Sequence, residues 1–419
     1  MAIGNFVTVG GAAHAQIAMV NTPAGGTASV AAWNTNRYDS AHNPSCASVF
    51  DTFTRDIDFS PDGTYFAVTS TGAFGGGAGS GTLCDTTTRW ETASTANDPT
   101  WVDYTGGDTT YGVASTGAAI YVGGHMRWEN NPFQGDQAGP GAVPREGIAA
   151  LDPVNGLPLS WNPGRARGVG AQALYATPAG LWVGSDTSRI GKEVHNRIAF
   201  MPLAGGVSIP AVAPSTLPNE LFLASTTSPG ALLRRPVDAA GSPTAPATTA
   251  NTAIDWSLLR GGWLVNGTLY YGLADGGLYA RSFNPSTGAV GAQRTVNLYD
   301  DPDNGARIPF AIAGLTGIFY DTTLHRIYYT VSGDARLFYR YFTPQSEVVG
   351  ALTFVAAANG VSFSGVQGMT LAGGRILYGS AADGALRSVP FAGGAVTGGP
   401  TVVSADGTWR YRAIFVRSA

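Results

Sequence analysis

Residues 55–69 read Arg-Asp-Ile-Asp-Phe-Ser-Pro-Asp-Gly-Thr-Tyr-Phe-Ala-Val-Thr. An apolar strand, a turn containing Asp-Gly and an aromatic strand follow one another here, which is the pattern of a β-hairpin. The same unit recurs along the chain, with second strands that begin near residues 120, 181, 269, 327 and 376. Most steps are roughly 50 to 60 residues long, which leaves room for about four strands in each. A repeat of this length predicts a β-propeller.

The two ends of the chain supply strands that none of the six copies uses. Residues 411–416 predict a first strand, whereas residues 3–11 and 16–20 predict the end of a second strand and a third strand. We therefore expect an all-β fold of seven four-stranded blades, in a ring closed by strands from both termini, because closure removes exposed strand edges. A ring of six blades, or of eight with a degenerate unit in the longest step, is the alternative.

One domain is expected over residues 1–419. The step between the copies near 181 and 269 is longer than the others, because it contains a stretch rich in Pro, Ala, Thr and Ser at about residues 208–252. This stretch predicts an insertion into the repeat rather than a linker between domains.

The composition excludes several classes of protein. The 419 residues include 58 glycines, and 12% of the chain is charged while 44% is hydrophobic. Aromatic residues make up 11% of the chain, which argues against disorder. Apolar runs stay well below the roughly eighteen residues of a membrane helix, so no membrane span is expected. The net charge of −4 and the absence of a basic stripe argue against nucleic-acid binding. We expect a monomer.

The two cysteines, Cys46 and Cys84, lie in polar, loop-like sequence away from any group of His and Asp residues. An even number of cysteines in a Lys-poor chain rich in Thr and Ser predicts one disulfide. The first residues lack the pattern of a signal peptide. If the protein is secreted, we therefore expect this sequence to be part of a longer precursor.

Several segments resemble a repeat of bacterial secreted β-propellers. They are Ile3-Gly-Asn-Phe-Val-Thr-Val-Gly-Gly, Tyr121-Val-Gly-Gly-His, Gly147-Ile-Ala-Ala-Leu-Asp-Pro-Val-Asn-Gly and Trp161-Asn-Pro. More specifically, residues 101–186 resemble the propeller module of large actinobacterial cell-surface proteins, which often carry carbohydrate-binding domains. The resemblance implies a propeller fold and an extracellular or cell-surface location. It implies little about activity, because a fold hosts many functions.

Three loops contain the residue types that a ligand site needs. The first, residues 124–133 continued by 144–146, holds an imidazole, a cation, an indole and an acid, whose side chains suit a sugar platform. The second, residues 161–168, holds two arginines, which could clamp a carboxylate. The third, residues 186–197, mixes acids, cations and an imidazole. The candidate ligand-binding residues are His125, Arg127, Trp128, Glu129, Arg165, Arg167, Asp186, Arg189 and His195. For each loop the alternative is a solvated hairpin held by its own ion pairs.

No cofactor is expected, and the scattered histidines lack metal-ligand spacing. Residues 300–305 are rich in oxygen ligands, so calcium at Asp301 and Asp303 is an alternative to a plain turn. The sequence also lacks Gly-X-Ser-X-Gly, His-Glu-X-X-His and a phosphate-binding loop, so no catalytic residue is assigned.

Three functions remain open. The first is a non-catalytic recognition module that binds a glycan or another cell-wall or extracellular polymer on the loop face. The second is a structural or protein-interaction platform. The third is a glycan-active lyase or hydrolase, which would need His125, Arg127, Arg165 and His195 to converge.

Overall fold

A computed structural model describes residues 1–39, 41–43, 52–72, 81–135, 137–165, 168, 170–300 and 310–417. Within these residues the protein is all-β, as predicted, and it contains no α-helix. The helical turns are three single-turn 3-10 helices, η1 (Leu203–Gly205), η2 (Trp256–Leu258) and η3 (Ile312–Gly314).

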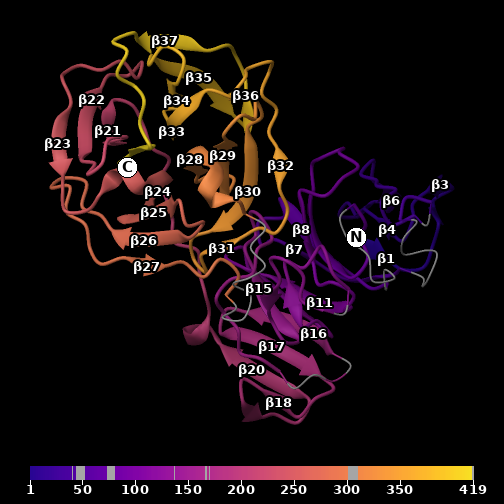
Figure 1. Ribbon diagram of the computed structural model, residues 1–419. Helices are drawn as coiled ribbons and strands as arrows, with labels where there is room; N and C mark the ends of the chain where they lie inside the picture. The colour runs from indigo at the N-terminus through magenta and orange to yellow at the C-terminus, as the bar shows by residue number, and fades with distance from the viewer. Residues whose placement is uncertain are drawn as a thin grey trace. The chain divides into compact units, whose positions relative to one another are not determined.

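The chain divides into two compact units (Figure 1). Unit 1 comprises Met1–Ile209, Tyr299–Pro309 and Gln345–Ala351. Unit 2 comprises Pro210–Leu298, Phe310–Pro344 and Leu352–Ala419. The single domain expected over residues 1–419 stays a prediction.

Unit 1 contains three antiparallel sheets in which consecutive strands pair as hairpins. They are β7 (Thr54–Phe59), β8 (Tyr65–Ser70), β9 (Thr86–Glu91) and β10 (Trp101–Tyr104); β11 (Thr110–Ser115), β12 (Ile120–Gly124) and β15 (Ile148–Leu151); and β16 (Ala171–Thr177), β17 (Gly180–Ser185) and β20 (Ile198–Pro202). The first strand of each sheet lies beside the first strand of the next, β7 beside β11 and β11 beside β16.

Short strand pairs surround these three sheets. They are β1 (Ala2–Ile3) with β4 (Ile17–Ala18), β2 (Thr8–Val9) with β3 (Ala12–Ala13), β5 (Val20–Asn21) with β6 (Ser29–Val30), β13 (Trp128–Glu129) with β14 (Val143–Pro144), and β18 (Arg189–Ile190) with β19 (Glu193–Val194). The strand β31 (Val348–Val349) lies in the last segment of unit 1.

Unit 2 contains four sheets. They are β38 (Ala413–Val416), β21 (Asn219–Ala224), β22 (Leu232–Val237) and β23 (Thr248–Asn251); β24 (Leu259–Val265), β25 (Thr268–Leu273), β26 (Leu278–Ser282) and β27 (Arg294–Thr295); β28 (Leu315–Asp321), β29 (Arg326–Val331), β30 (Phe338–Thr343) and β32 (Phe354–Val355); and β33 (Val366–Ala372), β34 (Arg375–Ser380), β35 (Leu386–Ala392), β36 (Ala395–Val396) and β37 (Thr401–Ser404).

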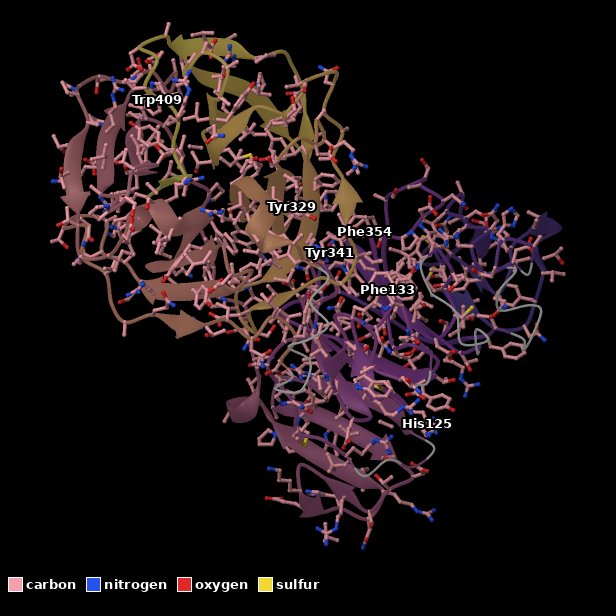
Figure 2. All side chains as sticks on the ribbon, in the orientation of Figure 1. His125, Phe133, Tyr329, Tyr341, Phe354 and Trp409 are labelled. Carbon is pink, nitrogen blue, oxygen red and sulfur yellow. The ribbon has the colours of Figure 1, made fainter. Side chains whose placement is uncertain are left out.

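The first strands of these four sheets follow one another in a cycle. Strand β24 packs beside β28, β28 beside β33, β33 beside β38, and β38 beside β24. Figure 1 shows the four sheets of unit 2 arranged around these strands. Aromatic side chains fill the spaces between the sheets, for example the buried Trp409 (Figure 2) and the pair of Phe319 in β28 with Phe391 in β35, whose ring centroids are 5.6 Å apart.

A glycine marks three of the four close approaches of one first strand to the next. A Cβ atom at Gly261 of β24 would lie 2.6 Å from Cγ2 of Ile318 in β28. A Cβ at Gly317 of β28 would lie 2.7 Å from Cγ of Met369 in β33, and one at Gly368 of β33 would lie 2.8 Å from Cγ1 of Ile414 in β38. The pairing of each of these first strands with its second strand shifts by a β-bulge at the same place.

The closure predicted from the two ends of the chain is wrong. The C-terminal strand β38 pairs with β21, in the register Leu221↔Val416 to Ala224↔Ala413. The N-terminal strand β1 pairs instead with β4. Strand pairing within the described residues therefore does not show the predicted seven-bladed ring.

The prediction of an insertion at about residues 208–252 is also wrong, because this stretch belongs to a sheet that the C-terminal strand completes. This stretch contains β21, β22 and β23, which complete a sheet with the C-terminal strand. Its strands have the sequences NELFLA, LLRRPV and TTAN, which lack the aromatic second strand that marks the other copies. The copy was missed because a strand from the far end of the chain supplies its first position.

The close approach of Gly368 to Ile414 predicts how much unfolding free energy a Cβ atom at Gly368 would cost. Gly368 and Gly360 have nearly the same backbone conformation, with φ of +72° and +76°, but the space around Gly360 is open. We expect Gly360→Ala to cost about 1 kcal/mol of unfolding free energy through its backbone alone. Gly368→Ala should cost about 2–4 kcal/mol, because the methyl group also meets Ile414. Urea denaturation measures both, and equal losses would contradict the role of the contact.

Candidate functional site

Arg165 joins the three loops that the sequence singled out. Its Nη2 donates to the carbonyl oxygen of Gly124 in the first loop at 2.6 Å, and its Nη1 lies 3.6 Å from Oδ1 of Asp186 in the third loop. The residue also forms a β-bridge with Ile190. The Arg165 side chain is fully buried, and burial lowers the pKa of its guanidinium while Asp186 raises it. Arg165 therefore holds the loops together rather than facing a ligand.

Asp108 pairs with two candidate residues of the first loop. Arg127 makes a bidentate pair with its carboxylate, at 2.7 Å from Nε to Oδ2 and 3.1 Å from Nη2 to Oδ1. His125 (labelled in Figure 2) places Nδ1 3.9 Å from Oδ1 of the same carboxylate. The Arg127 guanidinium also lies over the ring of the half-buried Trp128, 4.5 Å from the centroid. Both the cation and the indole thus have partners inside the protein.

Glu129 is not available to a ligand, so its assignment to the binding site is wrong. Its side chain is buried beside Asp103, whose Oδ1 accepts a hydrogen bond of 2.8 Å from the Asn130 amide. Burial raises the pKa of Asp103 to about 6. Burial and the neighbouring Asp103 raise the pKa of Glu129 well above its usual value. Two carboxyl groups this close in a buried site share one proton rather than ionise together.

One cation lies beside this carboxyl pair. Arg145 is buried and lowers the pKa of Glu129, and its Nη2 pairs with Oδ2 of Asp300 at 2.8 Å. The Arg145 guanidinium also donates to the carbonyl oxygen of Leu159 through Nη2 at 2.6 Å. Asp108, which pairs with Arg127, raises the pKa of Glu129.

The remaining candidates lie on the exposed β18–β19 hairpin or outside the described residues. Arg189 donates to the carbonyl oxygen of Lys192 at 3.5 Å, and His195 Nε2 lies 3.4 Å from Oε2 of Glu193. Residues outside the described ranges are Arg167, Asp301, Asp303 and Cys46, so the calcium site and the disulfide stay predictions. The other cysteine, Cys84, is buried. In the described parts of the chain, no three His, Cys, Asp or Glu side chains are grouped as metal ligands are.

The carboxyl pair predicts how stability depends on pH. Both folded pKa values are raised above the ordinary values of 3.8 and 4.5, so the folded state binds more protons than the unfolded chain. The contribution of the carboxyl pair to the free energy of unfolding is therefore complete below about pH 4, and it is lost as the pH rises through 6 and beyond. We expect Glu129→Gln to flatten this loss in urea denaturation between pH 4 and 8.

The matched control is Glu146→Gln, which changes an exposed carboxyl group of the same loop. This variant should keep the pH dependence of the unmodified protein. An unchanged pH profile in Glu129→Gln would show that the pair does not share a proton.

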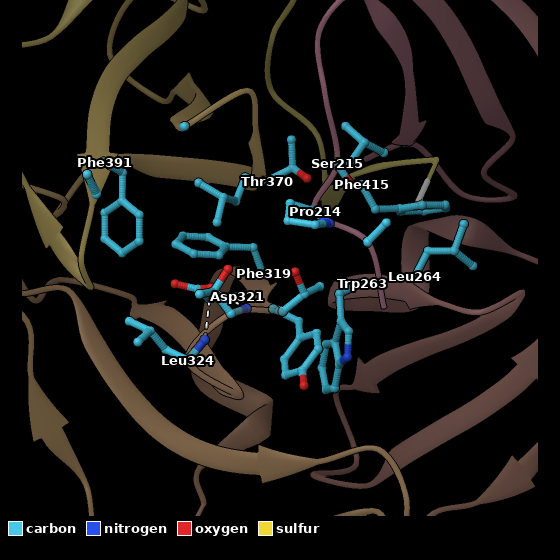
Figure 3. A pocket seen from close by; sticks show the side chains of 18 of the residues that line it. Pro214, Ser215, Trp263, Leu264, Phe319, Asp321, Leu324, Thr370, Phe391 and Phe415 are labelled. Carbon is cyan, nitrogen blue, oxygen red and sulfur yellow. Dashed lines mark hydrogen bonds between the residues drawn. The ribbon is translucent and has the colours of Figure 1, made fainter. Parts of the chain in front are cut away.

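Unit 2 contains a pocket that the sequence did not indicate (Figure 3). Its volume is about 220 Å³, and residues at the carboxyl ends of all four first strands line it. These residues are Trp263 and Leu264 of β24, Phe319, Tyr320 and Asp321 of β28, Thr370 and Leu371 of β33, and Phe415 and Val416 of β38. The segments 213–215, 322–324 and 391–393, together with Gly374, complete the wall.

Aromatic rings pack against one another in the wall of the pocket. The Trp263 ring stacks on Tyr270 with centroids 5.3 Å apart and meets the edge of Phe342 at 5.4 Å. Phe319 stacks on Tyr328 at 5.1 Å and meets Phe391 edge to face at 5.6 Å. The pocket thus presents apolar surfaces that other rings support.

The polar groups of the described lining are hydroxyl groups and one carboxyl group. The Nε1 atom of Trp263 is fully buried and does not open into the pocket. Oδ1 of Asp321 accepts from the amides of Thr323 at 2.9 Å and Leu324 at 3.3 Å, the second of which Figure 3 marks. Asp321 is the only charged residue in the described lining. The pocket therefore suits a neutral ligand with an apolar face and hydroxyl groups.

One signal in the sequence could have found this pocket. Residues Trp263, Phe319 and Thr370 occupy equivalent places in their copies, shortly before the turn to the second strand. An alignment of the copies groups these positions. It does not include Phe415, because its strand stands alone at the end of the chain.

Comparisons with known proteins do not identify a family. No protein-family model matches the sequence, and no curated protein matches it. A chain of a nidogen/laminin complex is 12% identical, with 58% of this chain and 97% of that chain covered and a TM-score of 0.26. The glutaminyl cyclase of Myxococcus xanthus is 10% identical, with 49% and 75% covered and a TM-score of 0.24.

A third solved structure is the PQQ-bound aldose sugar dehydrogenase of Streptomyces coelicolor. It is 14% identical, with 50% of this chain and 90% of that chain covered and a TM-score of 0.23. Similarities this weak carry no argument about function. Along the described chain, no helix has the length and apolar character needed to cross a membrane.

Proposed function

We propose that this chain is a recognition module on the outside of a bacterial cell, and that it binds a neutral glycan in the pocket of unit 2. We also propose that unit 2 is a four-bladed β-propeller, with its first blade completed by β38. The cyclic packing of β38, β24, β28 and β33 supports this architecture. A propeller brings the ends of its first strands together around one axis, which is where the pocket lies.

The single observation that carries the proposal is the aromatic pocket at the converging carboxyl ends of the four first strands. A sugar ring has an apolar face of C–H groups and a rim of hydroxyl groups. It therefore matches both the aromatic wall and the hydroxyl groups of Ser215 and Thr370 in the lining. The volume of about 220 Å³ suits a single ring, such as a terminal residue or side branch of a glycan.

The charge of the pocket lining restricts the kind of glycan that the pocket can bind. Asp321 would repel a uronate or a phosphorylated sugar, and the described lining contains no Arg or Lys. The arginines that the sequence offered for a carboxylate do not contribute here, since Arg165 lies in unit 1 and bonds to Gly124. The charges of the lining therefore favour a neutral ligand.

The test is a glycan array with the full chain, followed by calorimetric titration of the best neutral ligand. We expect Trp263→Phe to weaken binding about tenfold, because the variant loses part of the aromatic wall. The matched control is Trp256→Phe. Trp256 is also buried in unit 2, but its Nε1 already donates to Oδ1 of Asn251 at 3.2 Å and it does not line the pocket.

The control should lose stability but bind the ligand as the unmodified protein does. Binding to no neutral glycan would overturn the proposed function. Equal affinities of the Trp263→Phe and Trp256→Phe variants would place the ligand elsewhere on the chain and would overturn the assignment of the pocket as the binding site.

A further inference from the structure

The sheet β16–β17–β20 of unit 1 has one face in the core and one face in solvent. Leu174, Leu181, Val183, Ala199 and Met201 pack toward the neighbouring sheet. The opposite face consists of three cross-strand rows, which we call the aromatic face. The rows are Ala173–Gly184–Ile198, Tyr175–Trp182–Phe200 and Thr177–Gly180–Pro202.

The aromatic face is unusual because its side chains are apolar and exposed. Tyr175 is 69% exposed, Trp182 is 42% exposed and Ile198 is 60% exposed. An antiparallel sheet with one solvated face ordinarily alternates apolar and polar residues, but none of these nine residues is Asp, Glu, Lys, Arg or His. Exposed apolar patches of this kind mark binding surfaces.

The three aromatic rings follow one another across adjacent strands. The centroids of Trp182 and Phe200 are 4.9 Å apart, with a tilt of 45° between the ring planes. Glycines stand on both sides of Trp182 on its own strand, at 180 and 184, so no neighbouring side chain of β17 covers the indole. Backbone pairing to β16 and β20 holds the row in place.

The size of the face argues against a protein partner. Three strands span roughly 10 Å across the sheet, and three rows span about 14 Å along it. A patch of this size is far smaller than the roughly 800 Å² that each partner buries in a stable protein interface. A row of rings about 10 Å long is instead comparable to two linked sugar rings.

We propose that the aromatic face binds a neutral β-1,4-linked polysaccharide chain. Its sugar rings lie across the three strands and stack on Tyr175, Trp182 and Phe200. A β-1,4 link keeps successive rings flat and turns an apolar C–H face toward the protein, which matches an uncharged aromatic row. The inference deepens the proposed function, since it assumes a carbohydrate ligand, but it uses different residues in a different unit.

The experiment measures binding of the full chain to microcrystalline cellulose and to chitin in a sedimentation assay. We expect one of these polymers to bind the protein, and the double variant Tyr175→Ala/Trp182→Ala to bind at least tenfold less. Both side chains are exposed, so the variant should keep its melting temperature. Val402→Ala is the matched control, because Val402 is an exposed apolar strand residue of unit 2, and it should bind normally.

The outcomes separate this inference from the pocket of unit 2. Loss of polymer binding in Tyr175→Ala/Trp182→Ala, with binding kept in Trp263→Phe, supports the aromatic face independently of the pocket. No binding to either polymer, or equal binding by the double variant, overturns the inference. If analytical ultracentrifugation shows a dimer that the double variant abolishes, the face binds a second copy of the chain and the polysaccharide is excluded.

Discussion

The structure of unit 2 depends on how closely its first strands approach one another. At three successive contacts a glycine faces a side chain of the next first strand: Gly261 faces Ile318, Gly317 faces Met369 and Gly368 faces Ile414. A side chain at any of these positions would overlap its neighbour, and the spacing between sheets would have to widen. The β-bulge beside each glycine turns the strand into this contact. Glycine thus contributes here by its missing Cβ rather than by flexibility.

The pocket is a consequence of the same constraint. Because the first strands converge, their carboxyl ends bring Trp263, Asp321, Thr370 and Phe415 around one space. The aromatic residues there pack against other rings. The carboxyl group of Asp321 and the aromatic ring of Trp263 come from different strands, and they form one site only because the strands meet.

Unit 1 uses its few charges differently. Only 12% of the chain is charged, and the first loop places several of these groups inside the protein. Asp108 neutralises Arg127, Arg165 ties the loops together, and Asp103 shares a buried site with Glu129. Several side chains that the sequence offered for a ligand site, among them Arg127 and Arg165, are therefore paired with groups of the protein itself.

The sequence alone predicted the all-β class and the hairpins of the repeat, because turn residues and alternating apolar positions act over a few residues. It also placed the three loops of Arg165, Asp186 and His125 as special segments, although not the role of their charges. It failed where one sheet combines distant segments: β21 and β38 are joined by pairing that spans almost half the chain. The prediction for Glu129 failed because the spacing of residues does not show which side chains are buried. Burial decides whether a carboxyl group can contact a ligand or packs inside the protein.

Only the tertiary structure decided which strand ends meet at the pocket and which face of β16–β17–β20 stays exposed. Local sequence determines strands through short-range sterics and turn chemistry, whereas a site forms when side chains far apart in the chain share one space.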